Sequence, residues 1–283
     1  MPYGFKNYLI KEAKFNPETA EDYASVVEHF FKHLQIVKKR DIDIKDIKPS
    51  DIRHFLKMLS VRNRPSTINK KLSILKRFFD YAERKGIIPY SDPAAKIERL
   101  QEPKKNQIRP YEWFLEQYSR LLKLPDVPHE YKAVMILALH GAIPSDFLLR
   151  HEQVTLHHKK VILQTTNRKI VLEGEYAKDF LKYYKQSLEV KSPFVFTRIS
   201  RKGTIEPVNT INLTKILKKI AQLLGIEQPF TFTEARKSYM EYLYRVHQMS
   251  LMDIAKLFNL HILTVTETIT NMQKNGFPFH SES

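Results

Sequence analysis

Residues 65–97 read PSTINKKLSILKRFFDYAERKGIIPYSDPAAKI, and this stretch decides the fold. After Ser66 its apolar side chains recur every three or four residues, which predicts a helix with one buried face. Gly86 stands where such a helix should end, because glycine adopts the left-handed backbone of a helix C-cap without strain. The inward positions of the predicted helix are Ile68, Leu72, Leu75, Phe79 and Ala82.

The same stretch and the residues just before it are strongly basic, with no acid between Val61 and Arg77. Since apolar side chains take one face of the helix, polar and basic ones are pushed to the other. Ser66 and Thr67 leave free backbone N–H groups at the helix start, which can bind a phosphate. We expect this basic stripe to contact a nucleic-acid backbone, the alternative being a solvated basic surface. The stripe comprises Arg62, Arg64, Thr67, Asn69, Lys70, Lys71 and Arg77.

Two further helices with one apolar face each are predicted upstream. Asn16 followed by Pro17 is a favourable helix start, and a second start stands at Pro49. Residues 1–100 are therefore expected to form a helical domain. Downstream of Pro89, repeated prolines and the loss of any apolar period indicate a linker. Residues 101–110 are expected to join the first domain to a second one at 111–283.

The second domain is predicted to combine helices with a small β element. Two β-rich runs, 161–163 and 170–172, flank the letters QTTNRK, which predicts a β-hairpin with Arg168 and Lys169 at its tip. The expected fold class is mainly α with a small β-hairpin or sheet, in two domains. Helical patterns cover 131–139, 176–184, 210–224 and 233–246, and two short helices are expected after residue 250.

Composition excludes several function classes. The chain has 283 residues, enough for two domains, and no apolar run long enough to span a bilayer. Its first residues lack the apolar core of a secretory signal, so we expect a cytoplasmic, nucleoid-associated protein without membrane contact. The absence of cysteine excludes disulfides, thiolate catalysis and thiolate zinc sites. No metal or other cofactor is expected, because the 11 histidines show no ligand spacing.

The charge points to a polyanionic partner. The formal net charge is +16. Residues 1–100 carry 21 basic and 13 acidic side chains and the remainder 26 and 18, so each part has a balance of +8. Two domains that grip one polyanion would share the positive charge in this way. Each neutralised phosphate releases counterions, so binding is expected to depend strongly on salt.

The stretch at 65–97 closely resembles the core-binding domain of tyrosine recombinases of the phage integrase and Xer type. The order of elements after the linker is similar as well, and the resemblance covers nearly the whole chain. It implies a helical core-binding domain and an α+β catalytic-like domain that close around duplex DNA as a C-shaped clamp. The basic stripe would meet one face of the DNA. The second domain would meet the other through Arg168, Lys169, Arg201, Lys202, Thr210, Asn212, Lys215, Arg236 and Lys237.

The resemblance also implies where the reaction centre of the family would lie. Members attack a phosphodiester with a tyrosine, while two arginines, a histidine and a lysine stabilise charge and transfer a proton. In this chain the second arginine is kept as Arg236. The first arginine corresponds to Ile143 and the hairpin lysine to Gln164. The histidine three residues before Arg236 corresponds to Thr233.

The last two positions fall near the C-terminus. The later histidine corresponds to Asn259 or Leu260, with His261 adjacent, and the tyrosine to Thr268 or Ile269. No tyrosine follows Tyr244. Losing one transition-state donor typically costs about 10²–10³ in rate, so the loss of several together with the nucleophile predicts a chain that does not cleave DNA.

Three interpretations concern residues near Arg236. That arginine is expected to clamp a phosphate, the alternative being a salt bridge. Tyr239, Tyr242 and Tyr244 follow on the same helix, where core and flanking positions are expected rather than displaced nucleophiles. Residues 250–269 also resemble a helix-turn-helix, which we interpret first as the family's own terminal helices and second as an independent recognition unit.

The sequence therefore predicts a sequence-specific double-stranded DNA-binding protein on a tyrosine-recombinase scaffold, for example a repressor of a phage or mobile element. One alternative is a working recombinase with a relocated nucleophile. Another is an accessory partner of an active recombinase. Self-association is compatible with each of these functions.

Overall fold

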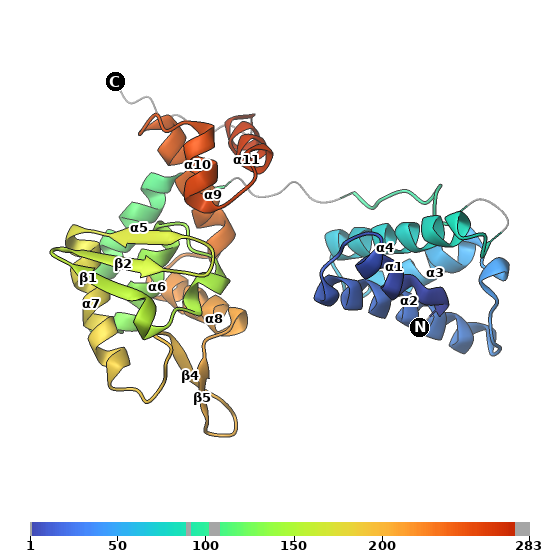
Figure 1. The fold of residues 1–283 in the computed structure, drawn as a ribbon, viewed down its shortest axis with the longest axis horizontal. Coiled ribbons are helices and arrows are strands. Elements are labelled where there is room, and N and C mark those ends of the chain that lie inside the picture. Colours follow the sequence, from blue (N-terminus) through green and yellow to red (C-terminus); the bar gives the residue numbers. More distant parts are fainter. Residues whose placement is uncertain (1, 89–91, 102–107, 275–283) are drawn as a thin grey trace. The chain divides into compact units, whose positions relative to one another are not determined.

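The computed structural model describes residues 2–88, 92–101 and 108–274, and the chain divides into two compact units, 1–105 and 106–283 (Figure 1). The division falls within residues 101–110, the segment expected to join two domains. Most of the described chain is helical and two small antiparallel sheets complete it. The predicted fold class is confirmed.

The first unit is a helical bundle. Helices α2 (Pro17–Lys38), α3 (Pro49–Ser60) and α4 (Pro65–Arg84) begin where the sequence predicts, and a short α1 (Phe5–Lys11) precedes them. The Asn16 side chain accepts a hydrogen bond of 2.7 Å from the Thr19 amide and caps α2. Beyond α4, Gly86 adopts a positive φ of 67°, as expected for a C-cap glycine. Phenylalanines fill the core, among them Phe5, Phe30, Phe55, Phe78 and Phe79.

The segment after α4 is not a free linker from Pro89 onward. Ile88, Ala94 and Ile97 are buried in the core of the first unit. The backbone of Leu100 is also held there, by the side chain of Asn69. The prediction of a linker beginning at Pro89 is wrong for residues 92–100, because scattered apolar side chains bury themselves without any helical period. Residues 89–91 and 102–107 lie outside the described residues.

Helices of the second unit enclose a large apolar core. They are α5 (Tyr111–Lys123), α6 (His129–Leu139), α7 (Gly174–Leu188), α8 (Thr210–Leu223) and α9 (Phe232–Arg245). Helix α6 is buried almost all round, which explains why its residues are apolar on every face. It contacts α5, α7, α8 and α9 and so forms the centre of this unit.

The three-stranded sheet has the order β1 (Val154–His157), β2 (Lys160–Gln164), β3 (Lys169–Leu172). The predicted hairpin is β2–β3, whereas β1 and a separate ribbon of β4 (Thr197–Ile199) and β5 (Ile205–Pro207) were not predicted. Strands β1, β4 and β5 are three or four residues long, too short for a clear alternation. In the hairpin, Val161 pairs with Leu172 and Leu163 with Ile170, which places four buried side chains on one face.

Two terminal helices, α10 (Leu251–Phe258) and α11 (Ile262–Lys274), pack on α9 (Figure 1). Asn259 joins them in a left-handed conformation. They share a small core of their own with Met240 and Leu243 of α9. These contacts fit the expectation of terminal helices belonging to the domain better than that of an independent recognition unit. Within the described ranges, no helix is long and apolar enough to cross a membrane.

Candidate nucleic-acid interface

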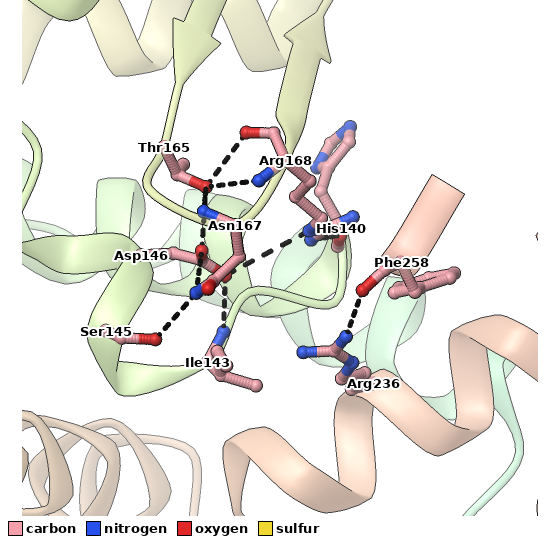
Figure 2. A network of polar contacts seen from close by, with 9 residues as sticks. All are labelled: His140, Ile143, Ser145, Asp146, Thr165, Asn167, Arg168, Arg236 and Phe258. Carbon is pink, nitrogen blue, oxygen red and sulfur yellow. Dashed lines mark hydrogen bonds and ion pairs between the residues drawn. The ribbon is translucent and has the colours of Figure 1, made fainter. Parts of the chain in front are cut away.

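Two buried arginines meet at the junction of the hairpin, α9 and α10 (Figure 2). The Arg236 side chain extends from α9 and donates a hydrogen bond of 2.7 Å from Nη2 to the carbonyl oxygen of Phe258. The guanidinium carbons of Arg168 and Arg236 lie 4.7 and 5.1 Å from the centroid of the Phe258 ring. One aromatic ring therefore contacts two cations by cation–π interaction.

Arg168 does not lie on an exposed hairpin tip, so that prediction is wrong. Its side chain is only 4% exposed, and its Nη2 donates to the carbonyl oxygen of His140. The reason is the alternation of the strand, because Arg168 shares the inward face with the buried Ile170 and Leu172. Lys169 has the opposite parity and is exposed.

Asp146 is the acid that faces these arginines. One of its carboxylate oxygens lies 4.0 Å from Nε of Arg168. The carboxylate also accepts hydrogen bonds of 2.8 Å from the Thr165 hydroxyl and 2.9 Å from the Ile143 amide. Asn167 adds a weaker contact of 3.4 Å (Figure 2). These donors hold a buried carboxylate that no sequence pattern indicated.

The cluster carries an excess of positive charge. Burial lowers the pKa of Arg168 to about 10, Asp146 opposes this shift, and the charge of Arg236 adds to it. Burial also lowers the pKa of Arg236. The pKa of His140 is lowered as well, chiefly by burial. Two guanidinium groups beside one carboxylate form a site that favours an additional anion.

Phe258 is held against this cluster from a second side. A Cβ atom on Gly141 would lie 2.6 Å from Cε1 of the Phe258 ring, and Gly141 has a φ of +67°. Both observations require glycine at that position. The ring also packs against Tyr239. Phe258 thus covers the arginine pair in this structure.

The positions expected to correspond to the family's reactive groups lie in different surroundings. Ile143 precedes a short 3-10 helix (Pro144–Phe147) and its amide donates to Asp146. Thr233 is exposed near the start of α9, and Leu260 is half-buried after α10. Ile269 is 3% exposed and lies in the core that α9, α10 and α11 share.

Two of these positions have a reactive neighbour. Gln164, at the end of β2, pairs directly with Lys169, so a lysine projects from the same face of the hairpin. His261 is exposed, and its Nδ1 accepts a hydrogen bond of 3.3 Å from the Leu263 amide at the start of α11. That imidazole acts as a local helix cap.

The tyrosines of α9 occupy the predicted core and flanking positions. Tyr239 stacks on Tyr111, and burial raises its pKa. Tyr242 is half-buried and also contacts Tyr111. Tyr244 is exposed on the flank of the helix.

In the first unit the basic stripe divides into buried and exposed members. Asn69 is 7% exposed, and its side-chain amide donates to the Leu100 carbonyl (2.9 Å) and accepts from the Leu100 amide (2.8 Å). The prediction that Asn69 faces DNA is therefore wrong. The sequence predicts a polar face on this helix, but the segment after α4 covers part of that face. The Asn69 side chain satisfies the backbone of that segment at Leu100.

The remaining members lie at the surface. Arg77 is exposed and its guanidinium stacks over the Phe15 ring at 5.0 Å. Arg64 precedes α4 and its side chain does not cap the helix, but the amides of Thr67 and Ile68 donate to the Arg64 carbonyl, so the expectation of a free amide at Thr67 is wrong. Among the described residues, no acid forms an ion pair with the exposed Arg62, Arg64 and Lys70 or with Lys71. Lys71 and Thr67 are both half-buried.

The second unit presents a further set of predicted residues at its surface. Arg201 and Lys202 lie in the turn between β4 and β5, and Thr210 begins α8. Most of this set is exposed, whereas two members are half-buried. The exposed residues are Lys169, Arg201, Lys202, Thr210 and Lys215, and the half-buried ones are Asn212 and Lys237.

Arg109 is a structural residue that the sequence did not reveal. It binds Glu234 through two contacts of 2.7 and 2.9 Å and stacks over Trp113 at 4.3 Å. It ties the start of the second unit to α9, just before Arg236. In the part of the chain that the structure describes, no group of three histidine, aspartate or glutamate side chains is placed to hold a metal ion.

Comparison with known proteins supports the resemblance. Residues 3–86 match the family model of the phage integrase N-terminal SAM-like domain. The tyrosine recombinase XerD of Listeria monocytogenes serovar 1/2a is 23% identical over 286 residues, covering 95% of this chain and 93% of that protein. The XerD of Listeria innocua serovar 6a has the same identity over 287 residues, with the same coverage.

Solved structures share the fold along the whole chain. A lambda integrase (75–356) dimer bound to a COC' core site matches with a TM-score of 0.66 and 14% identity, covering 99% of this chain and 97% of that one. The XerH recombinase in a pre-cleavage complex with difH matches with a TM-score of 0.62 and 16% identity, over 96% of this chain and 82% of that one.

Proposed function

The chain is a member of the tyrosine recombinase family, and on that premise we propose that it binds double-stranded DNA sequence-specifically without cutting it. Its role would be that of a transcriptional regulator, such as a repressor of a phage or mobile element. The two units would bind one duplex, with phosphates held by lysines and arginines and bases read by arginine and asparagine side chains in the major groove.

One contrast carries this proposal. Cations that pair with no described acid lie at the surface of the first unit, and a buried pair of arginines lies in the second, whereas the positions expected for the nucleophile hold Thr268 and Ile269. Ile269 is 3% exposed and has no hydroxyl, and the hydroxyl of Thr268 donates to the Thr264 carbonyl, so neither side chain offers the phenol of a tyrosine to a phosphodiester. This contrast supports DNA binding without cleavage.

Arg236 would act on DNA only after a rearrangement. In the free protein its Nη2 is occupied by the carbonyl oxygen of Phe258. A phosphate oxygen is the stronger acceptor because it carries charge, so a bound backbone can replace that carbonyl. The excess positive charge around Arg168 and Arg236 favours this exchange.

A working recombinase with a relocated nucleophile is the first rival. Lys169 lies opposite Gln164 and would supply a lysine at the hairpin, which is the observation in its favour. Incubation with a nicked suicide substrate distinguishes a working recombinase from a non-cleaving regulator, because cleavage would leave a covalent protein–DNA adduct on a denaturing gel. We expect no adduct.

Selection of bound fragments from random or genomic DNA tests the binding itself. We expect the isolated chain to enrich a defined site and to bind it more tightly than a scrambled duplex of equal length. An absence of affinity even at low salt contradicts the proposal. Enrichment only in the presence of an active recombinase supports the second rival, an accessory partner.

A further inference from the structure

The second unit contains a hollow of about 290 Å³, and its lining includes Asn212 and Lys215 from the predicted DNA-contacting set. It lies between the start of α6, strand β4 and one face of α8. Cationic, acidic, uncharged polar and apolar side chains line it. The residues that decide its chemistry are Arg198, Lys215, Lys219, Glu130, Tyr131 and Ile216.

The cations lie on α8 and β4. Lys215 and Lys219 are four residues apart, so they project from the same face of α8, and both are exposed. Neither forms an ion pair with any of the described acids. Arg198 binds Glu206 through Nη2, but its Nε is buried and has no hydrogen-bond partner among the described residues. These groups favour an anionic ligand atom.

Glu130 supplies the opposite chemistry. It stands in the first turn of α6 and accepts no hydrogen bond from the described residues. Burial raises the pKa of its carboxyl group, and Lys219 opposes that shift. A carboxylate without a donor from the described residues is free to accept N–H groups from a ligand.

We propose that this pocket binds a guanine mononucleotide. Guanine presents two adjacent donors, N1–H and the N2 amino group, which match the two oxygens of one carboxylate, here Glu130. The phosphate would face Lys215 and Lys219, and the ring would lie against Tyr131 and Ile216. Adenine places an acceptor nitrogen beside its amino group, so the same carboxylate repels it.

The ligand would also act on DNA binding, a step that rests on the proposed function. Lys215 lines the pocket and is one of the residues expected to contact DNA. One ammonium group cannot fully serve both a nucleotide phosphate and a DNA phosphate. The nucleotide is therefore a competitor of DNA, and by linkage each ligand weakens the other by the same factor.

The pocket is tested without DNA, by calorimetric titration of the full chain with GMP, AMP and inorganic phosphate. We expect saturable binding of GMP, at least about tenfold weaker binding of AMP, and weak binding of phosphate, since one charge-assisted hydrogen bond accounts for such a factor. Glu130→Gln should reduce GMP affinity about tenfold and should not weaken AMP, since the carboxylate attracts guanine and repels adenine.

Lys219→Ala should weaken both nucleotides, while Lys218→Ala, one residue away and outside the pocket, should change neither. Thermal melting of each variant verifies folding. Equal affinity for GMP and AMP, or equal effects of the two lysine variants, overturns the proposal. If GMP does not bind and Glu130→Gln instead alters DNA affinity, the pocket belongs to the DNA interface and the proposal is also overturned.

A DNA titration in the presence and absence of saturating GMP tests the competition separately. We expect GMP to weaken DNA binding in the wild-type chain and not in Lys219→Ala. GMP binding in a chain that has no DNA affinity would remove the proposed function while the pocket assignment stands. DNA binding without GMP binding would remove the pocket assignment while the proposed function stands.

Discussion

Arg236 Nη2 lies 2.7 Å from the carbonyl oxygen of Phe258, so the final residue of α10 is tied to α9 by a charge-assisted hydrogen bond. The same guanidinium lies over the Phe258 ring, 5.1 Å from its centroid. Arg236, which we expect to clamp a phosphate, therefore fixes the position of the terminal helices in the free protein. This double use makes Arg236 a residue of both stability and binding.

Replacement of Arg236 by alanine should destabilise the second unit. The change removes the hydrogen bond to Phe258 and leaves a buried carbonyl without its donor, which costs about 1.5–3 kcal/mol. Urea unfolding of the full chain measures the loss. Lys237→Ala is the matched control, because that side chain is half-buried on the same helix and has no such bond. Equal losses in the two variants would contradict the assigned contact.

The pair of Asp146 and Arg168 gives an asymmetric prediction. Asp146→Asn leaves two buried guanidinium groups without their counter-charge, which should cost about 3–5 kcal/mol. Arg168→Met should cost less, because Asp146 keeps the hydrogen bonds from Thr165 and Ile143. Unfolding free energies of both variants and of the double variant test this order. The double variant should lose less than the two single losses combined.

Part of the fold and part of the arginine site could be predicted from the sequence. The helix starts at Asn16 and Pro49 follow local rules and are correct, and the alternation of β3 already places Arg168 on the inward face with Ile170. Asn69 differs, because its partner Leu100 is 31 residues away and no local pattern reports it. Asp146 and the Phe258 contact likewise depend on segments that meet only in the folded chain.

Asn69→Ala should therefore affect stability rather than DNA binding. Loss of the two hydrogen bonds to Leu100 should cost about 1–2 kcal/mol and release the segment that follows α4. Hydrogen exchange at residues 94–101 in the full chain measures that release. Lys70→Ala, on the adjacent and exposed position, should leave exchange unchanged and weaken DNA binding. If Asn69→Ala weakened DNA binding at unchanged stability, Asn69 would contact DNA after all.

Acid should loosen α2 and α3 in the first unit. His33 Nε2 lies 3.1 Å from His54 Nδ1, and burial, then His54 and His29, lower the pKa of His33 below its ordinary value of 6.5. The stability from neutral His33 is present above about pH 6.5 and is lost as the pH falls through the lowered pKa. Hydrogen exchange of α2 and α3, corrected for intrinsic rates, should show this loss as the pH is lowered from neutral. His33→Gln should flatten the dependence, and an unchanged slope would rule His33 out.

Salt dependence distinguishes the exposed members of the basic stripe from other lysines. Each phosphate contact contributes about 0.9 to the slope of log affinity against log salt, because one condensed counterion is released. Lys70→Ala and Arg64→Ala should each weaken binding to all duplexes and make that slope shallower by about one unit. Lys85→Ala is the control, since Lys85 ends the same helix but is paired with Glu12. Fluorescence anisotropy over a salt series measures the slopes. An equally shallow slope for Lys85→Ala would show that overall charge, and not the stripe, holds the DNA.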